Sequence, residues 1–112
     1  MIVGIGVDVV EIGRLRKALD RHKDRFVRRV FTSGEQEFCL AHYDPVPHYA
    51  VRFAAKEALF KALGTGWARG VSWLDAEIER HGQSAPVMML HGEAEKVSST
   101  LGARAVHVSL SH

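Results

Sequence analysis

The chain has 112 residues, of which 46% are hydrophobic and 25% are charged, and its formal net charge is +2. That length suits one compact domain, 1–112, and the globular composition argues against disorder. No apolar run approaches the ~20 residues of a membrane span, no signal segment is visible, and the one cysteine, Cys39, cannot form an internal disulfide. These properties predict a cytoplasmic protein without a membrane span.

The positive charge is concentrated near the start of the chain. Residues 14–29 hold eight basic and two acidic side chains, a net charge of +6, whereas the remainder holds seven basic and eleven acidic ones, a net charge of −4. A basic face expects an acidic partner, which is a nucleic acid, an anionic membrane or an acidic protein. The alternative is an ordinary solvated helix surface. Only Phe26 interleaves the charges as an aromatic, which disfavours nucleic acid.

The first half of the chain reads as one strand followed by helices. The β-branched run at residues 2–10 predicts a strand that is buried on both faces. Apolar residues then recur at helical spacing in two stretches, from Ile12 to Leu19 and from Phe26 to Val30. Thr32-Ser33, with Glu35-Gln36 three residues later, is typical of a capping box that opens a short helix. Two prolines within residues 43–48 predict a loop.

The second half begins with the strongest helical pattern. Good helix formers fill residues 49–63 and end at Gly64-Thr65-Gly66. After them we expect strands at 74–79, 87–90 and 106–111, and a helix at 93–101 that is closed by Gly102. This order of elements predicts an α+β fold in which a small sheet is covered by the longest helix.

A pair of glycines, Gly4-x-Gly6, lies in the first predicted strand. Val9 stands where the third glycine of a dinucleotide-binding loop would fall, and no βαβ unit follows. The pair therefore favours close packing of another element on this strand.

Two acidic residues occupy positions that are costly for a carboxylate. Asp8 interrupts an otherwise apolar strand, and Glu57 lies among alanines on the long helix, four residues before Lys61. Taken singly, Asp8 is explained as a helix N-cap and Glu57 as the partner of Lys61 in an ordinary surface ion pair. Taken together, two carboxylates beside a lysine suit Mg²⁺, which takes one or two carboxylates plus substrate phosphates.

Several stretches of the chain carry a family resemblance. They are Gly6-Val7-Asp8 with Val10-Glu11-Ile12, the run Arg52-Phe53-Ala54-Ala55-Lys56-Glu57-Ala58-Leu59-Phe60-Lys61-Ala62-Leu63-Gly64-Thr65-Gly66, and the tail Leu90-His91-Gly92, Leu101-Gly102 and His107-Val108-Ser109-Leu110-Ser111-His112. In this order they resemble the holo-(acyl-carrier-protein) synthases, the small stand-alone members of the 4′-phosphopantetheinyl transferase superfamily. The resemblance implies a small, mainly antiparallel sheet wrapped around a long central helix, and a homotrimer with shared active sites.

The resemblance also implies a reaction. The 4′-phosphopantetheine arm moves from coenzyme A to a serine of apo acyl carrier protein, adenosine 3′,5′-bisphosphate is released, and the product supports fatty acid biosynthesis. By motif position, Asp8 and Glu57 are implied as the Mg²⁺ ligands on the pyrophosphate, with Mn²⁺ as an alternative metal. Glu57, or a water that it holds, is implied as the base for the serine, and Lys61 as the cation that helps the nucleotide leave.

Further residues are implied as contacts to the two substrates. Those for coenzyme A are Arg52, Lys61, Gly64, Pro86 and His112, and those for the carrier protein are Arg14 and Arg21. Acyl carrier proteins are strongly acidic, so they match the basic window at residues 14–29. Two other interpretations stay open at this point. One is a non-catalytic module that binds nucleic acid or an acidic protein, and the other is a family member that serves carrier domains of secondary metabolism.

The sequence departs from the family pattern at two places. Ser84 stands where the family usually has a glycine, two residues before the proline of the hairpin. The family also continues past its Ser-His pair with another strand, whereas this sequence stops at His112. We expect the missing strand to affect stability and oligomeric state more than chemistry.

Overall fold

The computed structural model describes residues 2–64, 70–80, 82–103 and 105–111, with the side chain of Lys23 left out. Its elements are α1 (Ile12–Val30), α2 (Ser33–Leu40), α3 (Val46–Leu63), the 3₁₀ turn η1 (Trp73–Asp75), β1 (Ala76–Glu79), β2 (Val87–Leu90) and α4 (Gly92–Thr100). The predicted α+β class is confirmed. No helix in the described part of the chain is long and apolar enough to cross a membrane.

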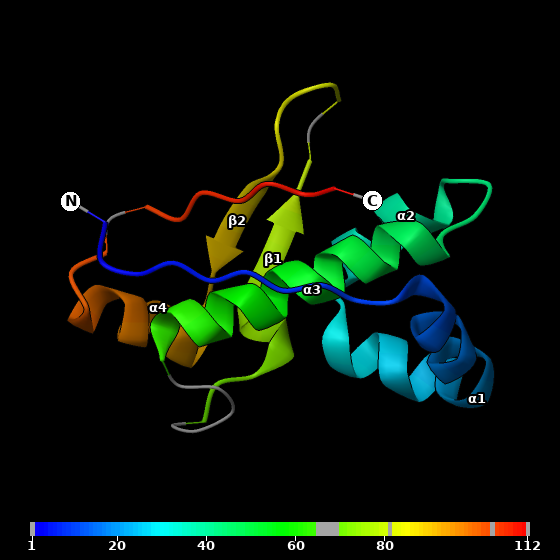
Figure 1. Ribbon diagram of the computed structural model, residues 1–112, viewed down its shortest axis with the longest axis horizontal. Coiled ribbons are helices and arrows are strands. Elements are labelled where there is room, and N and C mark those ends of the chain that lie inside the picture. The colour runs from blue at the N-terminus through cyan, green and yellow to red at the C-terminus, as the bar shows by residue number, and fades with distance from the viewer. Residues whose placement is uncertain (1, 65–69, 81, 104, 112) are drawn as a thin grey trace.

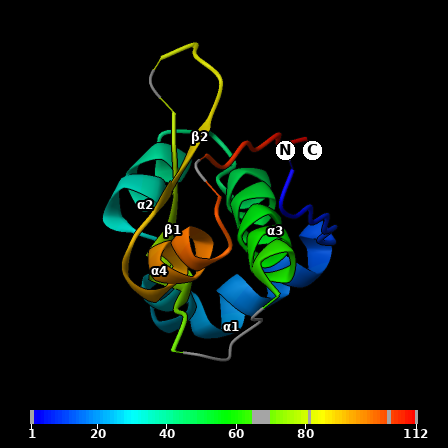
Figure 2. The same cartoon turned by 90° about the vertical axis from the view of Figure 1, so that its left-hand side faces the viewer.

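Helix α3 forms the centre of the molecule (Figure 1). Helices α1 and α2 pack near its N-terminal half, and the β1–β2 hairpin and α4 pack near its C-terminal half (Figures 1 and 2). Two hydrophobic clusters follow from this division. One joins Leu15 and Leu19 of α1 to Tyr49 of α3, and the other joins Phe60 of α3 to Val97 of α4.

The helical predictions before α3 are confirmed, with a kink where the sequence pattern breaks. Residue His22 has non-helical backbone angles inside α1, between the two predicted helical stretches. Helix α2 begins with the predicted capping box, in which the Glu35 backbone N–H donates to the Thr32 hydroxyl at 3.2 Å and the Thr32 N–H donates to Glu35 Oε1 at 2.9 Å.

The predicted loop at residues 43–48 is wrong in its second half, because α3 already begins at Val46. Pro47 lies in the first helical turn, where its fixed φ suits a helix and its missing N–H breaks no hydrogen bond. The helix ends as predicted at Gly64, whose φ of 73° is left-handed. Thr65 and Gly66 lie outside the described residues.

The predicted hairpin and last helix are confirmed with shifted bounds. Strands β1 and β2 pair antiparallel, with Ala76 opposite Leu90 and Ile78 opposite Met88. The alternation predicted for the first strand holds, since Ala76 and Ile78 are buried and Glu77 and Glu79 are half-buried. Leu74 and Asp75, which the sequence predicts as strand, belong to η1 instead, because Ser72 caps that turn.

The predictions for the two ends of the chain need correction. Residues 2–10 and 105–111 run extended along α3 (Figure 1), but neither is a strand of a sheet among the described residues. The first segment is also not buried on both faces, as Ile5 and Val9 are 82% and 88% exposed. Only the face toward α3 is covered. The last segment keeps its alternation, with Val106, Val108 and Leu110 packed on the core.

Candidate functional site

Gly4 and Gly6 allow the segment that contains Asp8 to pack closely against α3. An added Cβ at Gly6 would overlap the backbone oxygen of Ala58, and one at Gly4 would lie 2.8 Å from the backbone oxygen of Ala62. No side chain fits at such contacts, so glycine permits the close packing that the Gly4-x-Gly6 pair predicts. Because the extended segment is pressed against the helix in this way, Asp8 reaches the side chains of the last turns of α3.

Lys61 is the direct partner of Asp8. Its Nζ donates to Asp8 Oδ1 at 2.8 Å, and the lysine side chain is 58% exposed whereas the aspartate side chain is 15% exposed. The N-cap explanation of Asp8 is wrong, since Glu11 occupies the cap position of α1. The hydrogen bond to Asp8 is the main reason that the pKa of Lys61 is raised.

Glu57 completes the group, and its environment differs from that of Asp8. Burial raises the pKa of Glu57, and the hydrogen bond to Asp8 and the charge of Asp8 act in the same direction, while Lys61 opposes them. Burial alone would raise the pKa of Asp8, but hydrogen bonds to Lys61 and Glu57 lower it overall. Asp8 therefore stays ionised, and Glu57 is the carboxyl that more readily takes up a proton.

The donor set of this group fits Mg²⁺. The two carboxylates come from different elements and supply hard oxygen ligands, which Mg²⁺ prefers. Two carboxylates need waters and substrate oxygens to complete an octahedral shell, which is the usual arrangement when Mg²⁺ binds substrate phosphates. No cluster of three or more His, Cys, Asp or Glu with metal-binding geometry occurs among the described residues.

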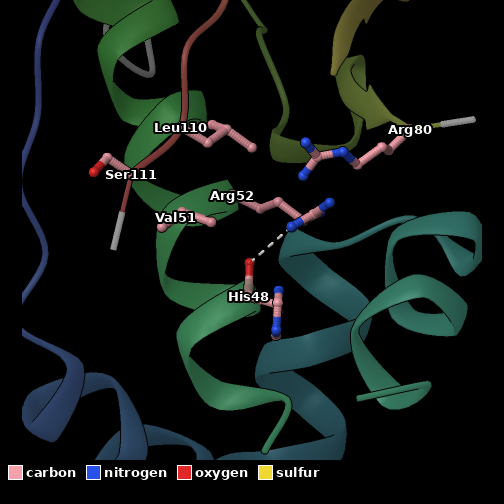
Figure 3. A pocket seen from close by; sticks show the side chains of 6 residues that line it. All are labelled: His48, Val51, Arg52, Arg80, Leu110 and Ser111. Atoms are coloured by element: carbon pink, nitrogen blue, oxygen red, sulfur yellow. Dashed lines mark hydrogen bonds between the residues drawn. The ribbon is translucent and has the colours of Figure 1, made fainter. Parts of the chain in front are cut away.

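A second feature is a cavity of about 290 Å³ beside the first half of α3. Its lining comes from α3, the residue after β1 and the C-terminal segment, and consists of His48, Val51, Arg52, Arg80, Leu110 and Ser111 (Figure 3). Arg52 lies five residues before Glu57, about 140° around the helix. It therefore does not share a face of α3 with the Asp8 group, which consists of Asp8, Glu57 and Lys61.

The guanidinium of Arg52 has unused hydrogen-bond donors. The side chain is 1% exposed, donates to the His48 carbonyl oxygen at 3.2 Å and covers the ring of Phe38 at 4.1 Å. Its Nε and one terminal nitrogen have no hydrogen-bond partner among the described residues. Burial lowers the pKa of Arg52, and the charge of Arg80 acts in the same direction. Two arginines on one cavity, with donors unused, suit an anion such as a phosphate.

The remaining predicted site residues are dispersed. Gly64 caps α3 three residues after Lys61, and Pro86 precedes β2 on the hairpin. Arg14 and Arg21 are exposed on α1. His112 lies outside the described residues. Sequence reasoning missed Arg80, because no motif surrounds it and its position on the cavity depends on where the hairpin packs.

Comparison with known proteins places the sequence and the fold beside one family. A sequence profile of the 4′-phosphopantetheinyl transferase superfamily matches residues 4–109. The holo-(acyl-carrier-protein) synthase of Koribacter versatilis is 44% identical over 112 residues, which cover 100% of this chain and 90% of the relative. The synthase structure from Neisseria meningitidis has a TM-score of 0.88 at 32% identity, with 100% and 90% coverage. That from Helicobacter pylori, in complex with coenzyme A, has a TM-score of 0.79 at 30% identity, with 96% and 89% coverage.

Proposed function

Because this chain belongs to the 4′-phosphopantetheinyl transferase superfamily, among its holo-(acyl-carrier-protein) synthases, we propose that Asp8, Glu57 and Lys61 form its transfer site. The chain transfers the 4′-phosphopantetheine arm from coenzyme A to a serine of apo acyl carrier protein, with release of adenosine 3′,5′-bisphosphate. We place this activity in fatty acid biosynthesis. The observation that carries the site assignment is the contact of Asp8, on the N-terminal segment, with Lys61 and Glu57 on α3.

Each residue of the group has a distinct task in the proposed mechanism. Glu57, whose pKa is raised, accepts the proton of the carrier serine either directly or through a water. Lys61 is the exposed member of the group, and it neutralises the negative charge that develops on the leaving nucleotide. Asp8 and Glu57 would hold Mg²⁺, or Mn²⁺ as an alternative, and the metal would supply positive charge to the pyrophosphate of coenzyme A.

Mass spectrometry of an apo carrier protein tests the function directly. Incubated with this protein, coenzyme A and Mg²⁺, the carrier should gain the mass of one phosphopantetheine arm. Omission of the metal, or its removal with a chelator, should abolish the gain. Unchanged carrier mass under all conditions would contradict the function, and equal modification without a divalent ion would contradict the metal site.

The arginine cavity supports a role for Arg52 in binding coenzyme A. Coenzyme A carries a phosphate monoester besides its pyrophosphate, and the unused donors of Arg52 suit such a group. Arg52 and the Asp8 group occupy different faces of α3. In a site shared between subunits, coenzyme A bound at Asp8, Glu57 and Lys61 of one copy would also contact the Arg52 cavity of the neighbouring copy. Gly64, Pro86 and His112 are proposed as further contacts of the same substrate.

We propose a homotrimer, supported by an uncovered apolar face. Ile2, Ile5, Val7 and Val9 of the N-terminal segment are 83%, 82%, 73% and 88% exposed. Ile5, Val7 and Val9 lie on the same face of the extended backbone, and an exposed apolar face favours association, because a short chain gains from burying it. Sedimentation at working concentration should give three times the mass of one chain. An active monomer at that concentration would contradict both the trimer and the shared site.

The exposed arginines of α1 are proposed to bind the acidic carrier protein. Arg14 and Arg21 are seven residues apart and lie about 20° from one another around the helix, so they share one face. Charge reversal at both positions should raise KM for the carrier at least tenfold and leave KM for coenzyme A nearly unchanged, because surface charge governs encounter with the partner. The wild-type rate at low carrier concentration should fall with salt, which screens charges beyond about 8–10 Å.

The matched control reverses Arg25 and Arg29, which are exposed on α1 beyond the kink at His22 and change the net charge by the same amount. This variant should show a smaller change in KM for the carrier. Equal effects of the two double variants would indicate attraction by net charge alone. Equal weakening toward both substrates would place Arg14 and Arg21 at the nucleotide.

A further inference from the structure

A buried ion pair joins α3 to the elements around it, one residue before Glu57 in the sequence. Lys56 Nζ lies 2.6 Å from Glu35 Oε1, and both side chains have no exposed surface. The ammonium also donates to the Val30 carbonyl oxygen at 2.6 Å and to the Trp73 carbonyl oxygen at 3.2 Å. An ammonium has three protons, so every donor of Lys56 is satisfied. Burial lowers the pKa of Lys56, and Glu35 opposes this change.

Glu35 extends the connection to two more elements. Its Oε1 accepts from the Thr32 N–H at 2.9 Å, and its Oε2 accepts from the Ile78 N–H at 2.9 Å. Through these bonds, one position of α3 is fixed to the end of α1, the start of α2, the turn η1 and the strand β1. The rotation of α3 about its own axis is thereby defined at Lys56.

Stability alone does not account for such a pair. Desolvation of two charges commonly cancels their attraction, so neutral residues of similar shape often stabilise a core equally well, and the best-attested role of buried ionic groups is to fix register. Here the register is the rotation of α3 about its axis, and this rotation determines where Glu57 lies relative to Asp8. A helix with side chains has a radius of about 5–6 Å, so a rotation by 10° moves the Glu57 carboxylate by about 1 Å relative to Asp8. Misplacement of that size can cost about a hundredfold in rate.

From these contacts we infer that the buried Lys56–Glu35 pair is a positioning device that sets the rotation of α3 and thereby aims Glu57 and Lys61 at Asp8. The inference rests on the proposed transfer site. Lys56 does not touch substrate in this assignment and acts only through the neighbouring residue. On the other side of the helix, the close contact of Gly6 with Ala58 holds the segment that carries Asp8. The Lys56–Glu35 pair and the Gly6–Ala58 contact together fix the positions of Glu57 and Asp8 relative to α3.

Two variants separate positioning from stability. Lys56→Met alone leaves the Glu35 carboxylate buried without its partner and should lower Tm by about 10 °C or more. Lys56→Met with Glu35→Gln removes both buried charges and keeps similar shapes. An amide accepts from only one of the Thr32 and Ile78 N–H groups, so about half of the lost Tm should return. The double variant should nevertheless keep a kcat at least tenfold below wild type, measured well below its Tm. Its KM for the carrier protein should stay within twofold, and half-maximal activity should need more Mg²⁺.

The control for destabilisation is Val97→Ala in the α4 core, which should lower Tm and leave kcat at wild-type level. A double variant with restored Tm and wild-type kcat would overturn the inference. A double variant as unstable as Lys56→Met would overturn it as well, because the pair would then be a requirement of the fold itself. Wild-type protein that fails to modify the carrier would overturn the proposed function instead, whatever the melting temperatures of the variants.

Discussion

Replacement of Glu57 by glutamine is expected to reduce the transfer rate by on the order of a thousandfold, because general bases contribute typically 10²–10⁴-fold and the proposed site also gives this residue the role of a metal ligand. The substitution keeps the shape of the side chain. It removes a carboxyl whose pKa is raised by burial and by Asp8. A carboxyl with a raised folded pKa opposes folding once it is ionised, so Tm at neutral pH should stay the same or rise slightly.

Initial rates at saturating coenzyme A and carrier, together with a thermal melt, measure both expectations. The matched control is Glu93→Gln, which makes the same chemical change in an ordinary pair with Lys96 on α4 and should leave the rate unchanged. Titration of Mg²⁺ separates the two roles proposed for Glu57, since loss of a ligand would raise the Mg²⁺ concentration needed for half-maximal rate. Near-normal turnover by Glu57→Gln would show that Glu57 is neither the base nor a required metal ligand.

The local signals of the sequence were sufficient for most of the fold. The capping box of Thr32 and Glu35 and the left-handed cap at Gly64 are decided by neighbouring residues, so both could be predicted. The terminal segments were not predictable in the same way. A β-branched run indicates extended backbone, but burial depends on what packs against each face. At Ile5 and Val9 the outward face meets no described residue that buries it.

In the candidate site as well, residues in local motifs could be predicted and residues placed by tertiary packing could not. Asp8, Glu57 and Lys61 could be predicted because they lie in recognisable motifs, and the structure brings them together. The second arginine of the cavity, Arg80, could not, because it arrives there through packing of the hairpin. The Glu35–Lys56 pair joins residues 21 positions apart and likewise has no local signal. Lys56 stands in the same motif as Glu57, but its burial becomes visible only in three dimensions.

The dependence of the site on tertiary packing leads to a prediction about a residue that has no functional group. Gly6→Ala should lower kcat/KM by about a hundredfold, because misplacement by about 1 Å costs that much. The added Cβ would overlap the Ala58 backbone oxygen, whereas such contacts normally need about 3.3 Å. The rigid helix does not yield, so the segment must move away and take Asp8 from Glu57 and Lys61.

The rest of the molecule should not respond to Gly6→Ala, which distinguishes loss of the site from loss of the fold. The N-terminal segment lies at the surface, and its contribution to the described hydrophobic clusters is the partly buried Val10, four residues after Gly6. Circular dichroism and Tm should therefore change little. Gly13→Ala is the matched control, because its new Cβ would meet only the flexible Glu11 carboxylate at 3.6 Å and alanine favours the helix. Normal turnover by Gly6→Ala would mean that the position of Asp8 does not depend on this contact, and a collapsed Tm would mean that the segment belongs to the core.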